Sequence, residues 1–458
     1  MPDEFFDRER ELAALDAAWR SPGSSLVLLW GRRRTGKTSL LGRFVGSKRA
    51  IFYGATEQAP AAELEAFSKA ARDALRPSGT DFLAHGHFTD WATAFDYLVQ
   101  RAQREKLAVV IDEFPYLVDA DPSLPSILQR FWDHLGRRSK LKLILCGSAQ
   151  AVMEELQADR APLFGRVDVR LQLRPFSHSE AALFTPRLPP EQKAIAYGVL
   201  GGMPTYLSRW RDDLGHRANL RHLFGNSASP LLEEGEYVLS NELHEGAGYF
   251  RILRAIASGN RTYSGIRRFA DIDVQRQLER LIQVGLVERV VPITENPSRT
   301  KRAVYRIADN FLSFWFRFVY RHRADVARGL GKEVVDRTIL PGLDDYMGEP
   351  WEEMCREHIR HMAAKGTLPV VVSSVGRWWS TDNTVEIDIV GLDGGKVVLA
   401  GSVKWAKAVE SRELERLRRA TESLPNRASR MQLVLCARQR LPKVDALCLS
   451  ARDVFAGE

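Results

Sequence analysis

A glycine-rich stretch near the N-terminus, GRRRTGKTS at residues 31–39, has the residue types and spacing needed to hold a phosphate. It fits the pattern G-x-x-x-x-G-K-[ST], the P-loop, in which backbone N–H groups turn inward around a phosphate and glycine permits a close approach. We expect Lys37 to reach the outer phosphates of a nucleotide and Thr38 to ligate Mg²⁺. The predicted nucleotide-binding residues are Gly31, Arg32, Arg33, Arg34, Thr35, Gly36, Lys37, Thr38 and Ser39.

Two acidic residues after a later apolar run supply the second half of this chemistry. Asp112 and Glu113 end the segment LAVVIDE at residues 107–113. A carboxylate at a neighbouring strand end can support magnesium, and the next carboxylate can polarise a water molecule for attack on the γ-phosphate. We therefore predict ATP and Mg²⁺ as ligands, Asp112 as a metal ligand with Thr38, and Glu113 as the catalytic base. A switch contact is the alternative role for Glu113.

Two further residues are candidates for sensing the γ-phosphate. Ser148 ends the apolar segment at 141–148, a position that faces the γ-phosphate in P-loop folds with an inserted strand. A plain strand-end turn is the alternative for Ser148. Arg166 could reach the nucleotide of its own or a neighbouring subunit as an arginine finger, or be a surface arginine near a turn. With Lys37 and Glu113, these two residues complete the predicted catalytic set.

A sheet must bring these strand ends together. Residues 25–30 form an apolar run typical of a buried strand, and residues 40–45 continue as the opening turns of a helix. Further strand segments at 51–54, 107–112 and 141–147 alternate with amphipathic helical stretches up to about residue 175. This alternation predicts an α/β fold with a parallel, doubly wound sheet.

Charge and composition bound the remaining possibilities. The 458 residues carry a net charge of +8, and residues 251–306 hold twelve Lys and Arg against five Asp and Glu. Concentrated basic charge indicates an anionic partner, although a solvated arginine-rich surface is the alternative. The four cysteines show neither a disulfide framework nor zinc-ligand spacing. We expect no membrane segment, because no apolar run approaches the required length, and a cytoplasmic location.

The basic segment also has the pattern of a winged helix. Helical stretches near 250–257, 264–269 and 273–282 precede an apolar hairpin with a polar, basic tip at 295–302. The face formed by Leu278, Leu281 and Ile282 is expected to pack inward. Such a module suits phosphate contacts on duplex DNA with little sequence information, or serves only for packing. The predicted DNA-contacting residues are Arg276, Arg280, Arg299, Lys301 and Arg302.

Four stretches in order give a resemblance to a known family. The segment FDREREL at 6–12, the P-loop, VIDEF at 110–114 and GGMP at 201–204 together resemble the archaeal-type ATPase family of P-loop proteins, which is related to the AAA+ and STAND groups. The resemblance implies an ATPase core, a helical lid, a winged helix and a nuclease-like C-terminal domain. A Gly-Gly-x-Pro break at 201–204 is itself typical of a turn that fixes the angle between helices.

The C-terminal stretch has a helix bearing Glu352, strands at 385–392 and 397–405, a basic helix at 409–421 and a further strand at 431–436. This order of elements resembles the restriction-endonuclease-like fold. In that family, the acid ending one strand and an acid two residues before a lysine on the next bind one divalent metal. Glu352, Asp388 and Lys404 match, but the second acid position is Ser402. A hydroxyl is a weaker Mg²⁺ ligand than a carboxylate, so we predict a retained fold with lost or feeble cleavage.

The sequence therefore predicts five domains: an ATPase core at 1–175, a helical lid at 176–245, a winged helix at 246–310, a helical linker at 311–345 and a degenerate nuclease-like domain at 346–458. We expect an ATP-binding, ATP-hydrolysing molecular switch that couples nucleotide state to DNA binding. An ATP-gated DNA nuclease and a signalling scaffold with a protein-binding winged helix are the alternatives. Duplex DNA, a protein partner and a second copy of the chain are the expected partners.

Overall fold

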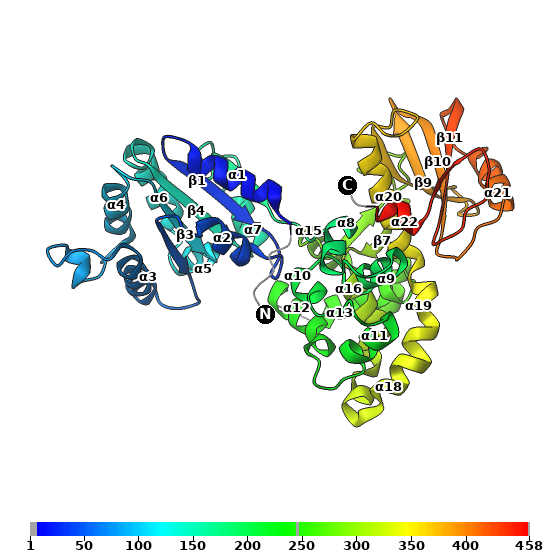
Figure 1. The fold of residues 1–458 in the computed structure, drawn as a ribbon, viewed down its shortest axis with the longest axis horizontal. Coiled ribbons are helices and arrows are strands. Elements are labelled where there is room, and N and C mark those ends of the chain that lie inside the picture. The colour runs from blue at the N-terminus through cyan, green and yellow to red at the C-terminus, as the bar shows by residue number, and fades with distance from the viewer. Residues whose placement is uncertain (1–6, 244–246, 457–458) are drawn as a thin grey trace. The chain divides into compact units, whose positions relative to one another are not determined.

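The computed structural model describes residues 7–243 and 247–456 and divides the chain into two compact units. One unit ends at Pro175 and the other begins at Phe176. Figure 1 shows the elements of both. Phe6, the first residue of the FDREREL segment, lies outside the described residues.

A five-stranded parallel sheet forms the centre of the N-terminal unit, in the order β2-β3-β4-β1-β5. Its strands are β1 (Ser25–Trp30), β2 (Ala50–Gly54), β3 (Leu107–Asp112), β4 (Leu141–Gly147) and β5 (Val169–Gln172). The predicted α/β class and parallel sheet are confirmed. Strand β4 lies between β1 and β3, as expected for a P-loop fold with an inserted strand.

Both faces of this sheet are covered by helices. Leu26 and Leu28 belong to one hydrophobic cluster, whereas Val27 and Leu29 belong to another on the opposite face. This double burial explains why β1 reads as a continuous apolar run. The helices are α1 (Glu9–Arg20), α2 (Lys37–Val45), α3 (Pro60–Leu75), α4 (Trp91–Arg101), α5 (Phe114–Ala120), α6 (Leu124–His134) and α7 (Gln150–Glu155), with 3-10 turns at Phe82–Ala84 and Gly136–Arg138.

The C-terminal unit begins with a group of short helices. They are α8 (His178–Ala181), α9 (Pro190–Leu200), α10 (Pro204–Leu207), α11 (His216–Phe224) and α12 (Glu234–Glu242), with 3-10 turns at Ala182–Phe184 and Pro230–Leu232. The Gly-Gly-x-Pro turn separates α9 from α10. A Cβ on Gly202 would lie 2.0 Å from the carbonyl oxygen of Phe176, so this position requires glycine.

Three helices and an antiparallel hairpin follow. They are α13 (Ala247–Ala257), α14 (Tyr263–Ala270), α15 (Gln275–Gln283), β6 (Val287–Val290) and β7 (Val304–Ile307). Leu278 and Leu281 of α15 are buried, and Ile282 packs against the same cluster. The hydrophobic pattern therefore oriented α15 correctly, leaving its polar face outward.

A series of helical segments leads from the hairpin to the last sheet. These are α16 (Asn310–Phe314), α17 (Arg323–Asp325), α18 (Gly331–Val334), α19 (Leu340–Tyr346) and α20 (Gly348–Ala364), joined by a 3-10 turn at Tyr320–His322 and π-helical turns at Trp315–Val319, Val326–Leu330 and Val335–Ile339. Aromatic residues anchor this series: Trp315 is buried, and its Nε1 donates to the carbonyl of Leu232 at 2.9 Å.

A second five-stranded sheet, ordered β12-β11-β10-β9-β8, ends the chain. Its elements are β8 (Ser374–Trp379), β9 (Glu386–Asp393), β10 (Lys396–Lys404), α21 (Arg412–Thr421), β11 (Arg427–Ala437), β12 (Leu447–Leu449) and α22 (Ala451–Val454). Strands β8 to β10 pair antiparallel and β10 to β12 pair parallel, so the sheet is mixed. This C-terminal α/β layer also agrees with the predicted fold class. Within the described ranges, no helix is long and apolar enough to cross a membrane.

Candidate functional site

The P-loop runs from the end of β1 into the first turn of α2. Gly31 is closely packed: a Cβ there would lie 2.2 Å from the carbonyl oxygen of Leu173, just beyond β5. Gly36 has φ 89°, the left-handed region that glycine adopts without strain, and immediately precedes α2. The two glycines of the pattern are thus required by the loop's own geometry, independently of any ligand.

Lys37 folds back across the loop. Its side chain is buried, with 6% of the residue exposed, and Nζ donates to the carbonyls of Gly31 at 2.8 Å and Arg32 at 3.0 Å. The Thr35 hydroxyl donates to the same Arg32 carbonyl at 2.8 Å. The loop is therefore held in a compact shape with the ammonium group inside it.

Thr38 and Asp112 meet across the strand ends. The Thr38 hydroxyl donates to Asp112 Oδ2 at 2.7 Å, although β4 separates β1 from β3. A hydroxyl and a carboxylate oxygen are hard ligands of the kind magnesium prefers, so these two residues fit the ion, with phosphate and water oxygens completing its shell. Among the described residues, no three Asp, Glu, His or Cys side chains form a metal-holding group. Burial, and then the Asp112 carboxylate, raise the pKa of the neighbouring Cys146 thiol.

Glu113 is held by Ser148. Its Oε2 accepts from the Ser148 amide at 3.1 Å and from the Ser148 hydroxyl at 2.8 Å. The Glu113 backbone has φ 54°, a left-handed conformation that non-glycine residues rarely adopt and that turns the chain from β3 into α5. The structure thus brings together the candidate base and the candidate sensor.

Other predicted residues of the N-terminal unit are either paired or exposed. Arg166 makes a two-point contact with Asp133, with Nε to Oδ1 at 2.9 Å and Nη2 to Oδ2 at 2.7 Å. Arg33 donates to the Tyr116 hydroxyl at 2.7 Å. Thr38 and Ser39 are exposed at the start of α2. Arg166 as an arginine finger stays a prediction, and it requires the release of Asp133.

Arg8 is a site residue to which the sequence analysis gave no role. It is buried, and Nη2 donates to the carbonyl of Thr35 at 3.3 Å and to that of Arg174 at 2.7 Å. One guanidinium thus fastens the P-loop to the chain that leaves the sheet. The only sequence signal was its place in the FDREREL segment.

The predicted DNA-contacting residues differ in their surroundings. Arg276 on α15 and Arg299 and Lys301 in the hairpin tip are exposed. Arg280 is half-buried and donates to Gln283 at 2.9 Å. Arg302 contacts the Glu295 carboxylate and the Trp379 carbonyl of β8, so its guanidinium is occupied inside the unit. The structure adds four exposed arginines on α13 and α14: Arg251, Arg254, Arg267 and Arg268.

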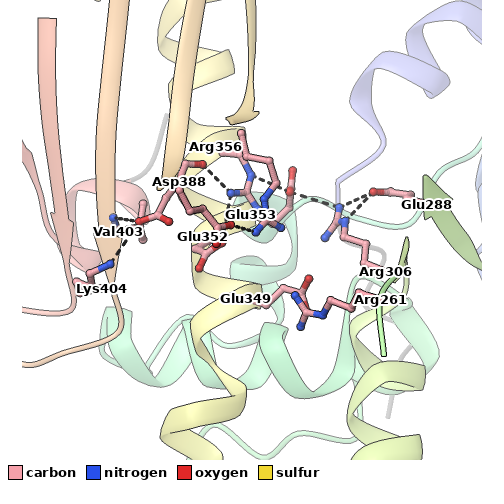
Figure 2. Close-up of polar contacts among 12 residues, drawn as sticks. Arg261, Glu288, Arg306, Glu349, Glu352, Glu353, Arg356, Asp388, Val403 and Lys404 are labelled. Atoms are coloured by element: carbon pink, nitrogen blue, oxygen red, sulfur yellow. Dashed lines mark hydrogen bonds and ion pairs between the residues drawn. The ribbon is translucent and has the colours of Figure 1, made fainter. Parts of the chain in front are cut away.

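The predicted nuclease-like residues lie near one another in the C-terminal unit. Asp388 Oδ2 accepts from the Val403 amide at 2.7 Å, and Lys404 Nζ lies 3.6 Å from the same oxygen (Figure 2). Burial, and then the charge of the Asp388 carboxylate, raise the pKa of Glu352 on α20 to about 7. Arg356 Nη1 bonds the backbone carbonyl of Asp388 at 2.8 Å.

A carboxylate absent from the sequence prediction joins this group. Glu413, in the first turn of α21, accepts from the Ser402 hydroxyl at 2.8 Å and lies 3.7 Å from Lys404 Nζ. Lys404 therefore stands between two carboxylates, from Asp388 and Glu413. Ser402, which stands where the family has an acid, thus contacts the carboxylate of Glu413, eleven residues further along the chain. A motif defined on strands does not include Glu413, because this residue lies on α21.

Two parts of the chain match models of known protein families. Residues 5–210 match the family model described as an ATPase domain predominantly from Archaea. Residues 315–417 match a model of archaeal and bacterial proteins of unknown function.

Individual relatives extend the match over most of the chain. An uncharacterized protein of Methanocaldococcus jannaschii is 30% identical over 420 residues, covering 91% of this chain and 90% of the relative. A shorter uncharacterized ATP-binding protein of the same organism is 40% identical over 45 residues, 10% of this chain and 76% of the relative. The Walker-type ATPase paby2304 of Pyrococcus abyssi shares the fold, with a TM-score of 0.50 at 22% identity over 69% of this chain and 97% of that structure. The chain belongs to the archaeal ATPase family of P-loop proteins.

Proposed function

We propose that this protein is an ATP-binding and ATP-hydrolysing molecular switch whose nucleotide state controls its affinity for duplex DNA. The observation that carries the proposal is the convergence of Thr38, Asp112, Glu113 and Ser148 at the carboxyl ends of β1, β3 and β4. Ligands bind at this edge of open α/β sheets. The family membership supports nucleotide binding at the same place.

The residues divide the work of hydrolysis among them. Lys37 exchanges the carbonyls of Gly31 and Arg32 for phosphate oxygens, and the exposed start of α2 adds a favourable dipole. Thr38 and Asp112 would hold Mg²⁺, which would neutralise charge on the phosphates. Glu113 leaves Ser148 and orients a water molecule, accepting its proton. The Ser148 amide and hydroxyl are then available to phosphate oxygens.

Basic side chains of the three-helix module, which comprises α13, α14, α15 and the β6–β7 hairpin, supply the DNA surface in this proposal. Exposed arginines on α13, α14 and α15 and the basic hairpin tip are suited to phosphate oxygens rather than base edges. Affinity from such contacts falls steeply with salt and carries little sequence preference. Coupling means that ATP and ADP change this affinity by different factors, and DNA then changes nucleotide affinity reciprocally.

Fluorescence anisotropy with a labelled duplex tests the coupling. The dissociation constant is measured with ATP, with ADP and without nucleotide, at several salt concentrations. We expect it to differ between ATP and ADP by about fivefold or more, within the usual range of coupling energies, and to lose this dependence in Lys37→Ala. Equal affinities in all three states would reject the switch, and an absence of salt-dependent DNA binding would favour a protein partner.

A metal-dependent DNA nuclease is the second candidate function, and Glu413 is the observation that favours it. The carboxylates of Asp388 and Glu413 flank Lys404, and the Ser402 hydroxyl donates to Glu413. Two carboxylates and a hydroxyl fit a hard divalent cation, which would supply Lewis-acid activation of a phosphodiester. Lys404 would then face the developing charge on the phosphate.

Incubation of supercoiled plasmid with Mg²⁺ or Mn²⁺, with and without ATP, tests this candidate. Cleavage that is lost in both Asp388→Ala and Glu413→Gln would establish it. Cleavage that survives Asp388→Ala would point to a contaminating nuclease, and no cleavage with either metal would leave the C-terminal sheet as a degenerate nuclease fold.

A further inference from the structure

A cavity of about 250 Å³ lies inside the C-terminal unit, where the β6–β7 hairpin, α20 and β8 meet. Its basic lining consists of five arginines, Arg289, Arg306, Arg356, Arg360 and Arg377. The acidic lining consists of Glu288 and Glu353. None of the nucleotide-site residues belongs to it, and positive charge exceeds negative charge on its wall.

One carboxylate serves three of these guanidinium groups. Glu353 lies 3.4 Å from Arg306, 3.1 Å from Arg356 and 2.8 Å from Arg360, and Figure 2 shows it between Arg306 and Arg356. Burial alone would raise the pKa of Glu353, but the three arginines lower it to about 2. The lining of the cavity still holds five guanidinium groups against two carboxylates, so an added anion would meet a surplus of cationic donors there.

The other two arginines leave donor capacity at the wall. Arg289 donates to the carbonyls of Pro297 and Thr300, neutral acceptors that leave its positive charge in place. Arg377 contacts Glu386, but its buried Nε has no hydrogen-bond partner within the described part of the chain. Because the acceptors of Arg289 are neutral, its charge is available to an oxyanion in the cavity.

We propose that this cavity binds one phosphate-class oxyanion, taken either as free phosphate or as a phosphodiester of DNA. Guanidinium groups match the oxygens of a phosphate in pairs, and a wall built from several arginines is the usual means of recognising one. The volume suits a single tetrahedral group with bound water rather than a whole nucleotide, because sites for larger ligands begin at roughly 300 Å³.

An anion bound in this cavity would have two structural effects. It would be held from one side by the hairpin and from the other by α20 and β8, so that occupancy joins the three-helix module to the C-terminal sheet. Arg356 also bonds the Asp388 carbonyl and approaches Glu352. The bound anion would thus lie one residue away from the Asp388–Lys404 group.

Titration of the full-length chain with inorganic phosphate tests the proposal. The Lys37→Ala chain is used as the parent, so that the P-loop does not contribute, and ionic strength is held constant with chloride. Calorimetry and thermal melting should show saturable binding. Arg360→Gln and Arg377→Gln should each weaken it about tenfold or more, the value of one charge-assisted hydrogen bond.

Arg328→Gln is the matched control, because Arg328 is an exposed arginine paired with Asp325 and its loss changes net charge equally. It should leave phosphate binding within about twofold. Binding that is not saturable, or that falls equally in Arg328→Gln, would overturn the proposal. This outcome is independent of whether wild type binds or hydrolyses ATP.

A second arm distinguishes the two sources of the anion. Anisotropy of a labelled duplex is measured with and without saturating phosphate at constant ionic strength. Competition, together with weaker DNA binding in Arg360→Gln, identifies a DNA phosphodiester as the occupant. Unchanged DNA affinity, with phosphate binding intact, identifies free phosphate.

Discussion

At the scale of single residues, Glu113 is the position whose chemistry is most directly testable. Glu113→Gln keeps the side chain's size and can still bond Ser148, but it cannot accept a proton. We expect ATP binding to persist and turnover to fall by about 10²-fold or more, the usual contribution of a general base. Single-turnover hydrolysis and equilibrium nucleotide binding measure the two effects separately.

The matched control is Glu9→Gln, which changes an exposed glutamate at the start of α1. It should leave both quantities unchanged. If Glu113→Gln hydrolyses ATP as fast as wild type, Glu113 is not the base, and its bond to Ser148 is then best understood as a switch contact.

Glu353 gives a second residue-scale prediction, concerning pH. Its folded pKa of about 2 lies below the ordinary value of 4.5, so the ionised form stabilises the fold above pH 4.5. The contribution, about 3 kcal/mol at most, is lost as pH falls from 4.5 to 2. Glu353→Gln should therefore lower the urea midpoint of the C-terminal unit at pH 7, and the difference from wild type should shrink below pH 4.5.

Glu415→Gln provides the comparison, because it removes an exposed ion pair with Arg418 on α21. Its midpoint should stay close to that of wild type across the same pH range. A difference between Glu353→Gln and wild type that stays constant from pH 7 to pH 3 would show that the three arginines do not lower the pKa of Glu353.

At the scale of elements, α15 and the hairpin tip should carry DNA binding together. The double variant Arg276→Gln and Arg299→Gln removes two exposed cations from separate elements without touching the core. We expect weaker binding to all duplex sequences and a salt slope shallower by about two. Arg302→Gln should differ: because Arg302 joins Glu295 to Trp379, its loss should lower stability more than the salt slope.

The measurement is the slope of log Kd against log salt concentration for wild type and both variants. Identical slopes in wild type and the double variant would place the DNA surface elsewhere, with the α13 and α14 arginines next in order. A shallower slope in Arg302→Gln would show that its contact with β8 opens on DNA binding.

Elements differ in how far the sequence determines them. Strands β1, β3 and β4 were predicted because burial on both faces produces continuous apolar runs, and the P-loop because its residues are adjacent in the chain. Strand β8 was not predicted: it lies at a sheet edge and contains Gly376 and Arg377, which break any alternating pattern. Edge strands bury less and therefore leave a weaker signal.

Site residues were likewise predictable only where the local sequence identifies them. Asp112 and Glu113 were found because they end a recognisable strand, whereas Arg8 and Glu413 act through partners far along the chain or on another element. The arginine-lined cavity also escaped prediction, since it needs the hairpin, α20 and β8 packed together. Arg302 was assigned to DNA because its contact with Trp379 depends on β8, which the sequence did not reveal.

At the scale of the whole molecule, two units with separate cores should unfold separately. Hydrophobic clusters of residues before Pro175 are distinct from those after it. We expect calorimetry to show two transitions, with ATP and Mg²⁺ raising only the one that belongs to the N-terminal unit. At a nucleotide concentration of 100 Kd, the stabilisation should be about 2.7 kcal/mol.

Lys37→Ala identifies the transition, because it should abolish the shift while keeping both transitions. A single transition that moves as a whole with ATP would show that the units unfold cooperatively. That result would also mean that nucleotide energy reaches the C-terminal sheet directly through the fold.

The bond between Glu113 and Ser148 has a mechanical consequence. Glu113 immediately precedes α5, and Ser148 comes two residues before α7, so each side chain is anchored at the root of a helix. Separation of the Glu113 carboxylate from Ser148 would release the first turns of α5 and α7 at the same time. Protonation of Glu113 would therefore act on α5 and α7 together, because these helices follow the adjacent strands β3 and β4.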